Sequence, residues 1–123
     1  MKLILVRHGS AFERGEAKRY LGTKIDPGLS AIGKRQASAT ARALKRRGIR
    51  PEAIFAGPAR RHSETAEILA EKLRASRPTM LPILSEIDYG PWEGLSKEEL
   101  LERWPAETAA WKKRGVWPDT FGS

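Results

Sequence analysis

The chain has 123 residues, of which 40% are apolar and 31% charged, a balance typical of a soluble globular domain that argues against a disordered chain. It contains no cysteine, which excludes disulfides and thiolate catalysis. Its opening apolar run ends at Arg7, too early for a signal-peptide core, and no run approaches the ~20 residues that cross a bilayer. We therefore expect one domain over residues 1–123, in the cytoplasm and without a membrane partner.

The net charge of +8 is unevenly distributed along the chain. Residues 34–61 are strongly basic and contain a single acid, Glu52, whereas residues 86–107 are mainly acidic. A basic surface favours an anionic partner, and phosphorylated small molecules, nucleic acid and plain solubility all fit this pattern. The basic stretch lacks the interleaved aromatic residues of a single-strand binding platform, so we do not expect nucleic acid as the partner.

Residues 2–6 are apolar and rich in branched side chains, which predicts a buried strand that ends in a loop at Arg7. Residues 10–28 contain several glycines and prolines and predict a long loop. A helix is expected over residues 30–47, because Ser30 is a suitable N-cap and Gly48 a suitable stop.

The remaining elements alternate in the same way. Residues 53–56 predict a second strand and residues 60–75 a second helix. Residues 80–84 predict a third strand, and Pro82 indicates either a sheet edge or an irregular stretch there. Ser96 and Glu99 fit a capping box that opens a helix to about residue 104, and a further helix follows to about residue 113. Strands that alternate with helices indicate a layered α/β fold with parallel strands.

Arg7-His8-Gly9 is the feature with the clearest chemistry, because it follows the first predicted strand at its carboxyl end. Ligands of open α/β sheets gather at that edge. A neutral imidazole is a good nucleophile near pH 7, an arginine can hold phosphate oxygens, and a glycine lets backbone N–H groups approach an anion. A histidine and an arginine that only make structural hydrogen bonds would fit this tripeptide equally well.

Four segments in order carry a resemblance to the histidine phosphatase (phosphoglycerate mutase-like) superfamily. They are Leu5-Val6-Arg7-His8-Gly9, residues 26–37, residues 56–66 and residues 84–94. The resemblance runs from about Lys2 to Leu101. It implies a three-layer α/β/α fold with a mostly parallel sheet.

The resemblance also implies the roles of individual residues. His8 would be the nucleophile that becomes phosphohistidine, Arg7 and Arg61 would hold the phosphoryl group, and Glu86 would donate a proton to the leaving oxygen and later activate water. Gly9 would supply a backbone donor. The chain would then be a phosphatase acting on a phosphomonoester of a small metabolite. We expect no metal and no other cofactor, because the sequence shows no cluster of metal ligands.

The chain departs from the family in two respects. The second active-site histidine of the family, on a later strand, has no counterpart, because the chain's histidines are His8 and His62 only. His62 adjoins Arg61 in a predicted helix, where neighbouring side chains point about 100° apart, so we do not expect His62 to replace it. The tryptophan-asparagine pair that follows the tripeptide in mutases is also missing, and Arg14 lies near the asparagine position. This favours a phosphatase over a phosphoglycerate mutase, with Arg14 as a candidate anion contact.

The family continues well beyond residue 123, and residues 117–123 resemble the loop before its next helix and strand. We therefore expect a truncated form of the fold that lacks C-terminal strands and leaves the first strand exposed. A homodimer or a swapped segment would cover that surface. A catalytically impaired fragment that binds phosphate or a partner is the alternative to an active phosphatase.

Overall fold

The computed structural model describes residues 1–118, which form two compact units. The first unit contains residues 1–16 and 26–86, and the second contains residues 17–25 and the chain from residue 87 onward. Residues 119–123 lie outside the described residues, so the loop predicted for residues 117–123 is largely untested. The single domain over residues 1–123 also stays a prediction.

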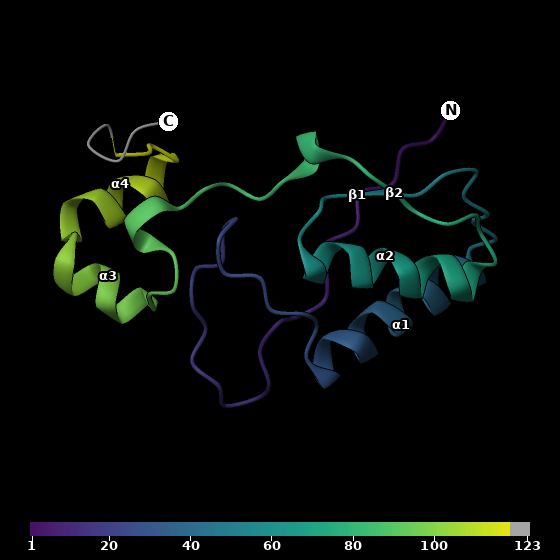
Figure 1. Cartoon of the computed structure of the whole chain (residues 1–123), viewed down its shortest axis with the longest axis horizontal. Coiled ribbons are helices and arrows are strands. Elements are labelled where there is room, and N and C mark those ends of the chain that lie inside the picture. Colours follow the sequence, from purple (N-terminus) through teal and green to yellow (C-terminus); the bar gives the residue numbers. More distant parts are fainter. Residues whose placement is uncertain (119–123) are drawn as a thin grey trace. The chain divides into compact units, whose positions relative to one another are not determined.

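Helix α1, Ala31–Arg46, confirms the first predicted helix and its two ends (Figure 1). The Ser30 hydroxyl accepts a hydrogen bond from the N–H of Gly33, which satisfies one of the free donors of the first turn. Gly48 follows the helix with φ of 71°, a left-handed conformation that glycine adopts without steric cost.

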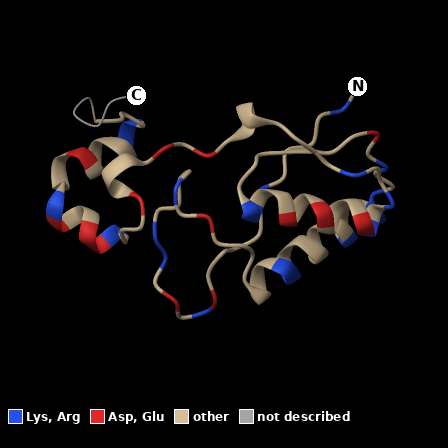
Figure 2. Ribbon diagram, in the orientation of Figure 1, with Lys and Arg blue, Asp and Glu red and all other residues tan. Residues whose placement is uncertain are grey.

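Helix α2, Arg60–Leu73, packs against α1 and confirms the second predicted helix. The buried residues of the two helices are mostly small, and small side chains let helix backbones approach closely: they include Ala37, Ala41, Ala66, Leu69 and Ala70. Figure 2 shows basic residues along α1, which has no acids, and acidic residues along α2. The first unit therefore has a small apolar core between two charged outer surfaces.

Strands β1, Phe55–Ala56, and β2, Thr79–Met80, pair in parallel, with Phe55 opposite Thr79. The parallel pairing confirms the predicted connection through a helix. The predicted third strand is correct only to Met80, because a 3-10 helix, η1, takes over at Pro82–Leu84. Proline lacks the N–H that a strand ladder requires, which explains why the strand ends there.

The predicted buried strand over residues 2–6 is wrong for the described chain. These residues belong to no strand, and the side chains of Leu3 and Leu5 are 80% and 87% exposed. A strand forms only where a neighbour accepts and donates its backbone hydrogen bonds, and β1 pairs with β2 alone among the described residues. The expected exposure of the first strand's apolar surface is therefore confirmed.

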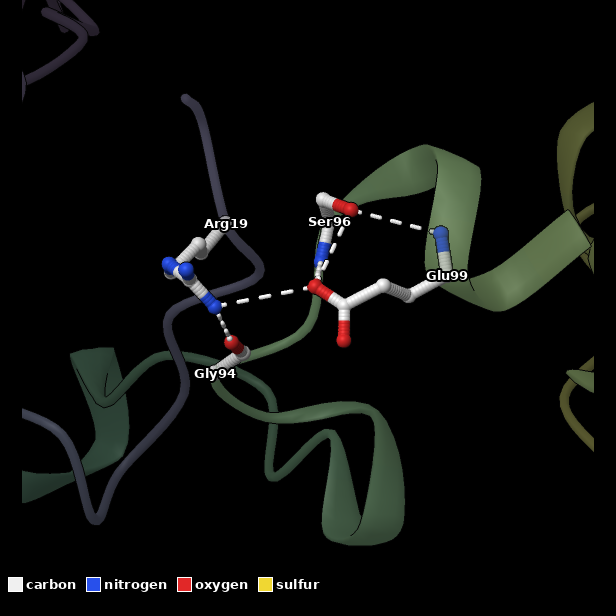
Figure 3. A network of polar contacts seen from close by, with 4 residues as sticks. All are labelled: Arg19, Gly94, Ser96 and Glu99. Atoms are coloured by element: carbon white, nitrogen blue, oxygen red, sulfur yellow. Dashed lines mark hydrogen bonds and ion pairs between the residues drawn. The ribbon is translucent and has the colours of Figure 1, made fainter. Parts of the chain in front are cut away.

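The second unit contains η2, Gly90–Trp92, and helices α3, Lys97–Arg103, and α4, Pro105–Arg114. Ser96 and Glu99 form the predicted capping box, in which the Ser96 hydroxyl and the Glu99 N–H are 3.3 Å apart. The Glu99 carboxylate also lies 3.7 Å from the guanidinium of Arg19. Arg19 in turn donates a hydrogen bond to the carbonyl of Gly94 (Figure 3). This network ties residues 17–25 to the start of α3.

Aromatic rings fill the interior of the second unit. The Trp92 side chain is fully buried, with its ring centroid 5.9 Å from that of Tyr20 and 5.2 Å from that of Trp117. Edge-on contacts at such distances add about 0.5–1.5 kcal/mol each beyond the apolar burial. Among the helices of residues 1–118, none has the length and hydrophobicity that a membrane crossing requires.

Candidate active site

The loop that carries His8 is held against the first turn of α1. A Cβ atom on Gly9 would lie 2.3 Å from the carbonyl oxygen of Gly33, and one on Gly33 would lie 2.0 Å from the carbonyl oxygen of Ser10. Only two glycines allow this approach. The N–H of Ser30 donates to the Ser10 carbonyl, and the N–H of Ser10 donates to Gln36. The helix start therefore fixes the backbone on the C-terminal side of His8.

His8 is held in one tautomer by its neighbour. Its Nδ1 atom lies 2.7 Å from the carbonyl oxygen of Gly9. A carbonyl can only accept a hydrogen bond, so Nδ1 carries the proton and Nε2 keeps its lone pair. The side chain is half-buried. His8 thus presents Nε2 as a nucleophile, which is the arrangement that phosphoryl transfer to histidine needs.

Arg61 lies in the first turn of α2 and is 1% exposed. Thr65, one turn later, accepts a hydrogen bond from the N–H of Gly9 and donates to the carbonyl of Arg61, at 3.0 and 2.8 Å. Thr65 therefore links the His8 loop to the helix that carries Arg61. A buried guanidinium is a permanent cation, and it needs an anion close by.

Glu86 supplies that anion in this structure. Its Oε2 atom lies 3.6 Å from Nη2 of Arg61, and the glutamate side chain is 27% exposed. Glu86 follows η1, so the 3-10 turn after β2 brings it to the start of α2. An approaching phosphate would meet the same guanidinium that the carboxylate now neutralises.

The start of α2 adds a further preference for anions. Ala59, at the N-cap, has no side chain that could accept a hydrogen bond, and the Asp26 carboxylate accepts instead from the N–H of Arg60 at 2.7 Å. Partial positive charge at a helix N-terminus stabilises negative groups. Asp26 belongs to the second of the four resembling segments, which explains how that segment contributes to the site.

His62 lies in the site, which sequence reasoning missed. Its ring centroid is 5.1 Å from that of His8, although helical spacing suggested that His62 and Arg61 diverge. Both residues stand in the first turn of α2, where two neighbouring side chains can flank the same helix end. Burial, followed by the charge of Arg61, lowers the pKa of His62, so its imidazole is neutral at neutral pH.

Gly57 makes room for the His62 ring. A Cβ atom on Gly57 would lie 2.7 Å from Nδ1 of His62 and 2.3 Å from the carbonyl oxygen of Leu84. That nitrogen is buried and has no hydrogen-bond partner among the described residues. The sequence does contain a signal for His62, because Gly57-Pro58 ends a strand just before the helix. The helical spacing alone indicated that the side chains of His62 and Arg61 point apart, so it did not reveal that His62 lies beside His8.

The structure brings together a group of potential metal ligands that the sequence analysis did not expect. One ligand atom each from His8, His62 and Glu86 lie within 4.8 Å of one another. The sequence could not show this, because the three residues come from a loop, a helix and a second loop. A sequence alone reveals only ligand clusters whose members lie within a few residues of one another, such as two ligands on one turn of a helix.

Of the predicted site residues, the structure brings together His8, Arg61 and Glu86. Arg7 and Arg14 are exposed and lie outside the cluster of His8, His62 and Glu86. The N–H of Gly9 donates to Thr65 and is therefore already engaged. Phosphate binding by Arg7, Gly9 and Arg14 stays a prediction.

A half-buried imidazole, a buried guanidinium and a carboxylate are the kinds of side chain that a phosphoryl-transfer site would use, and comparison with known proteins gives the family. The sequence model of the histidine phosphatase superfamily (branch 1) matches residues 3–122. The chain belongs to this superfamily. Phosphatases and mutases are both found among its relatives, which supports an enzyme of this broad class.

Two curated relatives illustrate the range. Phosphoserine phosphatase 1 of Hydrogenobacter thermophilus is 37% identical over 111 residues, which cover 90% of this chain and 50% of that protein. The 2,3-bisphosphoglycerate-dependent phosphoglycerate mutase of Bartonella henselae is 32% identical over 104 residues, which cover 83% and 50%. The chain thus spans about half the length of these relatives.

A solved structure agrees in fold. Mycobacterial glucosyl-3-phosphoglycerate phosphatase, in a complex with VO3, superposes with a TM-score of 0.77 and 29% identity, over 89% of this chain and 52% of that one. The predicted α/β fold of phosphoglycerate mutase type, in a truncated form, is thereby confirmed. The family model over residues 3–122 includes His8, Arg61 and Glu86.

Proposed function

We propose that this chain is the nucleophile-bearing part of a phosphatase that hydrolyses phosphomonoesters of small metabolites through a phosphohistidine at His8. The observation that carries the proposal is the hydrogen bond from Nδ1 of His8 to the Gly9 carbonyl, which leaves Nε2 free to attack. The buried guanidinium of Arg61 supports it, because a phosphomonoester carries nearly two negative charges at neutral pH.

In the first step, Nε2 of His8 attacks phosphorus, and the bond from phosphorus to the ester oxygen breaks. The phosphate takes the place of Glu86 beside Arg61, and Glu86, entering the step in its protonated form, donates that proton to the ester oxygen, so the product alcohol leaves neutral. In the second step, the Glu86 carboxylate takes a proton from water, which attacks phosphorus and breaks the P–N bond. Inorganic phosphate leaves, and His8 and Glu86 return to their starting forms. Arg61, with Arg7, stabilises the charge on the transferring group.

Hydrolysis is favoured over transfer to a second phosphorylated substrate by the residues that follow the tripeptide. Ser10-Ala11-Phe12-Glu13-Arg14 follows the tripeptide where mutases of the family carry a tryptophan-asparagine pair, and Arg14 lies near the asparagine position. The Ser10 hydroxyl donates to the Phe12 carbonyl, so it serves the loop itself.

Incubation with phosphoramidate or an aryl phosphate tests the proposal. Intact mass should show one added phosphoryl group that is labile in acid, stable in base and absent from His8→Ala. A well-folded chain that binds vanadate but forms no adduct would instead support the catalytically impaired binding module. An adduct that persists in His8→Ala would remove His8 from the mechanism.

A further inference from the structure

His62 has no role in the proposed reaction, yet its imidazole lies beside the nucleophile. It is half-buried, as are His8 and Glu86, and the three offer ligand atoms within 4.8 Å of one another. Two imidazoles and one carboxylate form a set of protein ligands that zinc takes in enzymes. We propose that His8, His62 and Glu86 bind one divalent transition-metal ion of the zinc class, and that the bound ion holds the nucleophile in an inactive form.

The separations suit such an ion after a small adjustment. Two ligand atoms on a tetrahedral zinc ion are about 3.4 Å apart, given bonds of about 2.1 Å. The three side chains therefore need to close by about 1.4 Å at most, from the observed limit of 4.8 Å. Rotations about side-chain bonds supply movements of this size.

The surroundings of His8 and Glu86 match those of metal ligands. A ligating histidine commonly donates its other ring N–H to a backbone carbonyl, which fixes the tautomer. Nδ1 of His8 makes this bond to Gly9, and Nε2 is left for the ion. Glu86 offers a carboxylate oxygen to the same cluster and is oriented by its ion pair with Arg61.

His62 is prepared to supply a lone pair. Its Nδ1 atom has no hydrogen-bond partner among residues 1–118, and Gly57 leaves space for the ring. The positive charge of the Arg61 guanidinium repels the metal ion, so we expect a dissociation constant in the micromolar rather than the nanomolar range.

Inhibition follows from the shared lone pair. Nε2 of His8 cannot attack phosphorus while it coordinates a metal ion, because both uses need the same electrons. This part of the inference rests on the proposed function, whereas the binding of the ion does not. The metal site can therefore be tested without any turnover.

The test uses residues 1–123 without an oligohistidine tag, stripped with EDTA and exchanged into chelator-free buffer. Cobalt(II) is the probe, since its visible d–d absorption is far stronger in a four- or five-coordinate site than in water. The absorption should saturate at one equivalent, and zinc should abolish it by displacement. His62→Ala and Glu86→Gln should each weaken binding at least about 100-fold, since loss of a merely supporting group already costs about 10- to 100-fold.

Glu67→Gln is the matched control, because Glu67 is exposed on the same helix as His62. It should bind cobalt as the unmodified chain does, and circular dichroism should show that all variants fold. The site is ruled out if cobalt keeps the spectrum of the hydrated ion, or if His62→Ala binds as tightly as Glu67→Gln.

Zinc should also suppress formation of the phosphoryl adduct in the unmodified chain and in Glu67→Gln. In His62→Ala, the rate of adduct formation should be the same with and without zinc. The adduct assay in EDTA tests the proposed function alone, so the two proposals fail separately. Cobalt binding with unchanged adduct formation in zinc would contradict the inhibitory role.

Discussion

Gly9→Ala tests whether the close approach of the His8 loop to α1 builds the site. The added Cβ would lie 2.3 Å from the carbonyl oxygen of Gly33 and 2.8 Å from its carbon. Both atoms belong to the backbone, so no flexible side chain can move aside. Either the first turn of α1 or the loop must shift, and a shift of the loop moves His8 with it.

The expected cost follows from two opposing effects. Overpacking in a well-packed region costs about 1–3 kcal/mol, and a clash with backbone belongs at the upper end of that range. Replacement of glycine by alanine lowers the conformational entropy of the unfolded chain, which raises the free energy of unfolding by about 0.4–1 kcal/mol. The free energy of unfolding should therefore fall by about 2 kcal/mol, which corresponds to a urea midpoint lower by about 1 M.

Gly28→Ala is the control for this experiment. A Cβ there would meet the Glu64 carboxylate at 2.6 Å and an Arg60 nitrogen at 2.9 Å, both at the ends of flexible side chains. Its effect should stay within about 0.5 kcal/mol. Vanadate affinity should fall in Gly9→Ala and hold in Gly28→Ala. Equal urea midpoints and equal vanadate affinities for the two variants would refute the reasoning.

Three further variants test other parts of the account. Ser30→Ala removes the hydroxyl that accepts from Gly33 and should lower the free energy of unfolding by about 1 kcal/mol, as measured by urea denaturation. Hydrogen bonds from the backbone and side chain of Ser96 lower the pKa of Glu99 from 4.5, so its contribution to stability is present above pH 4.5 and is lost as the pH falls. The difference in urea midpoint between Glu99→Gln and the unmodified chain should accordingly shrink below pH 4.5, and a constant difference would contradict this. Arg61→Lys keeps the charge but loses the forked geometry, and should weaken vanadate binding about 10- to 100-fold in titration calorimetry, because a charge-assisted hydrogen bond is worth about 1.5–3 kcal/mol.

The helix ends could be predicted because their signals are local. Ser30, Gly48 and the Ser96-Glu99 pair act on backbone groups within a few residues, so the sequence contains the whole interaction. His8 was indicated by its place after the first predicted strand, whereas Arg61 and Glu86 could be proposed only through resemblance to a family. Their approach depends on the packing of a loop, a helix and a 3-10 turn that no short pattern encodes.

Two differences between the sequence-based expectations and the structure share a physical cause. Residues 2–6 have the composition of a buried strand, but a strand also needs a partner, and their backbone finds none within residues 1–118. His62 has helical spacing that directs it away from Arg61, but the first turn of α2 lets both reach the same cluster. In both cases tertiary neighbours decided the outcome rather than local preference.

The most direct test of the central claim is to locate the phosphoryl group on the ring of His8. Tandem mass spectrometry of the trapped adduct gives the residue, and NMR of the intact chain distinguishes phosphorylation at Nε2 from phosphorylation at Nδ1. The bond between Nδ1 and the Gly9 carbonyl predicts modification of His8 at Nε2. A phosphoryl group on Nδ1 of His8, or on His62, would contradict the account.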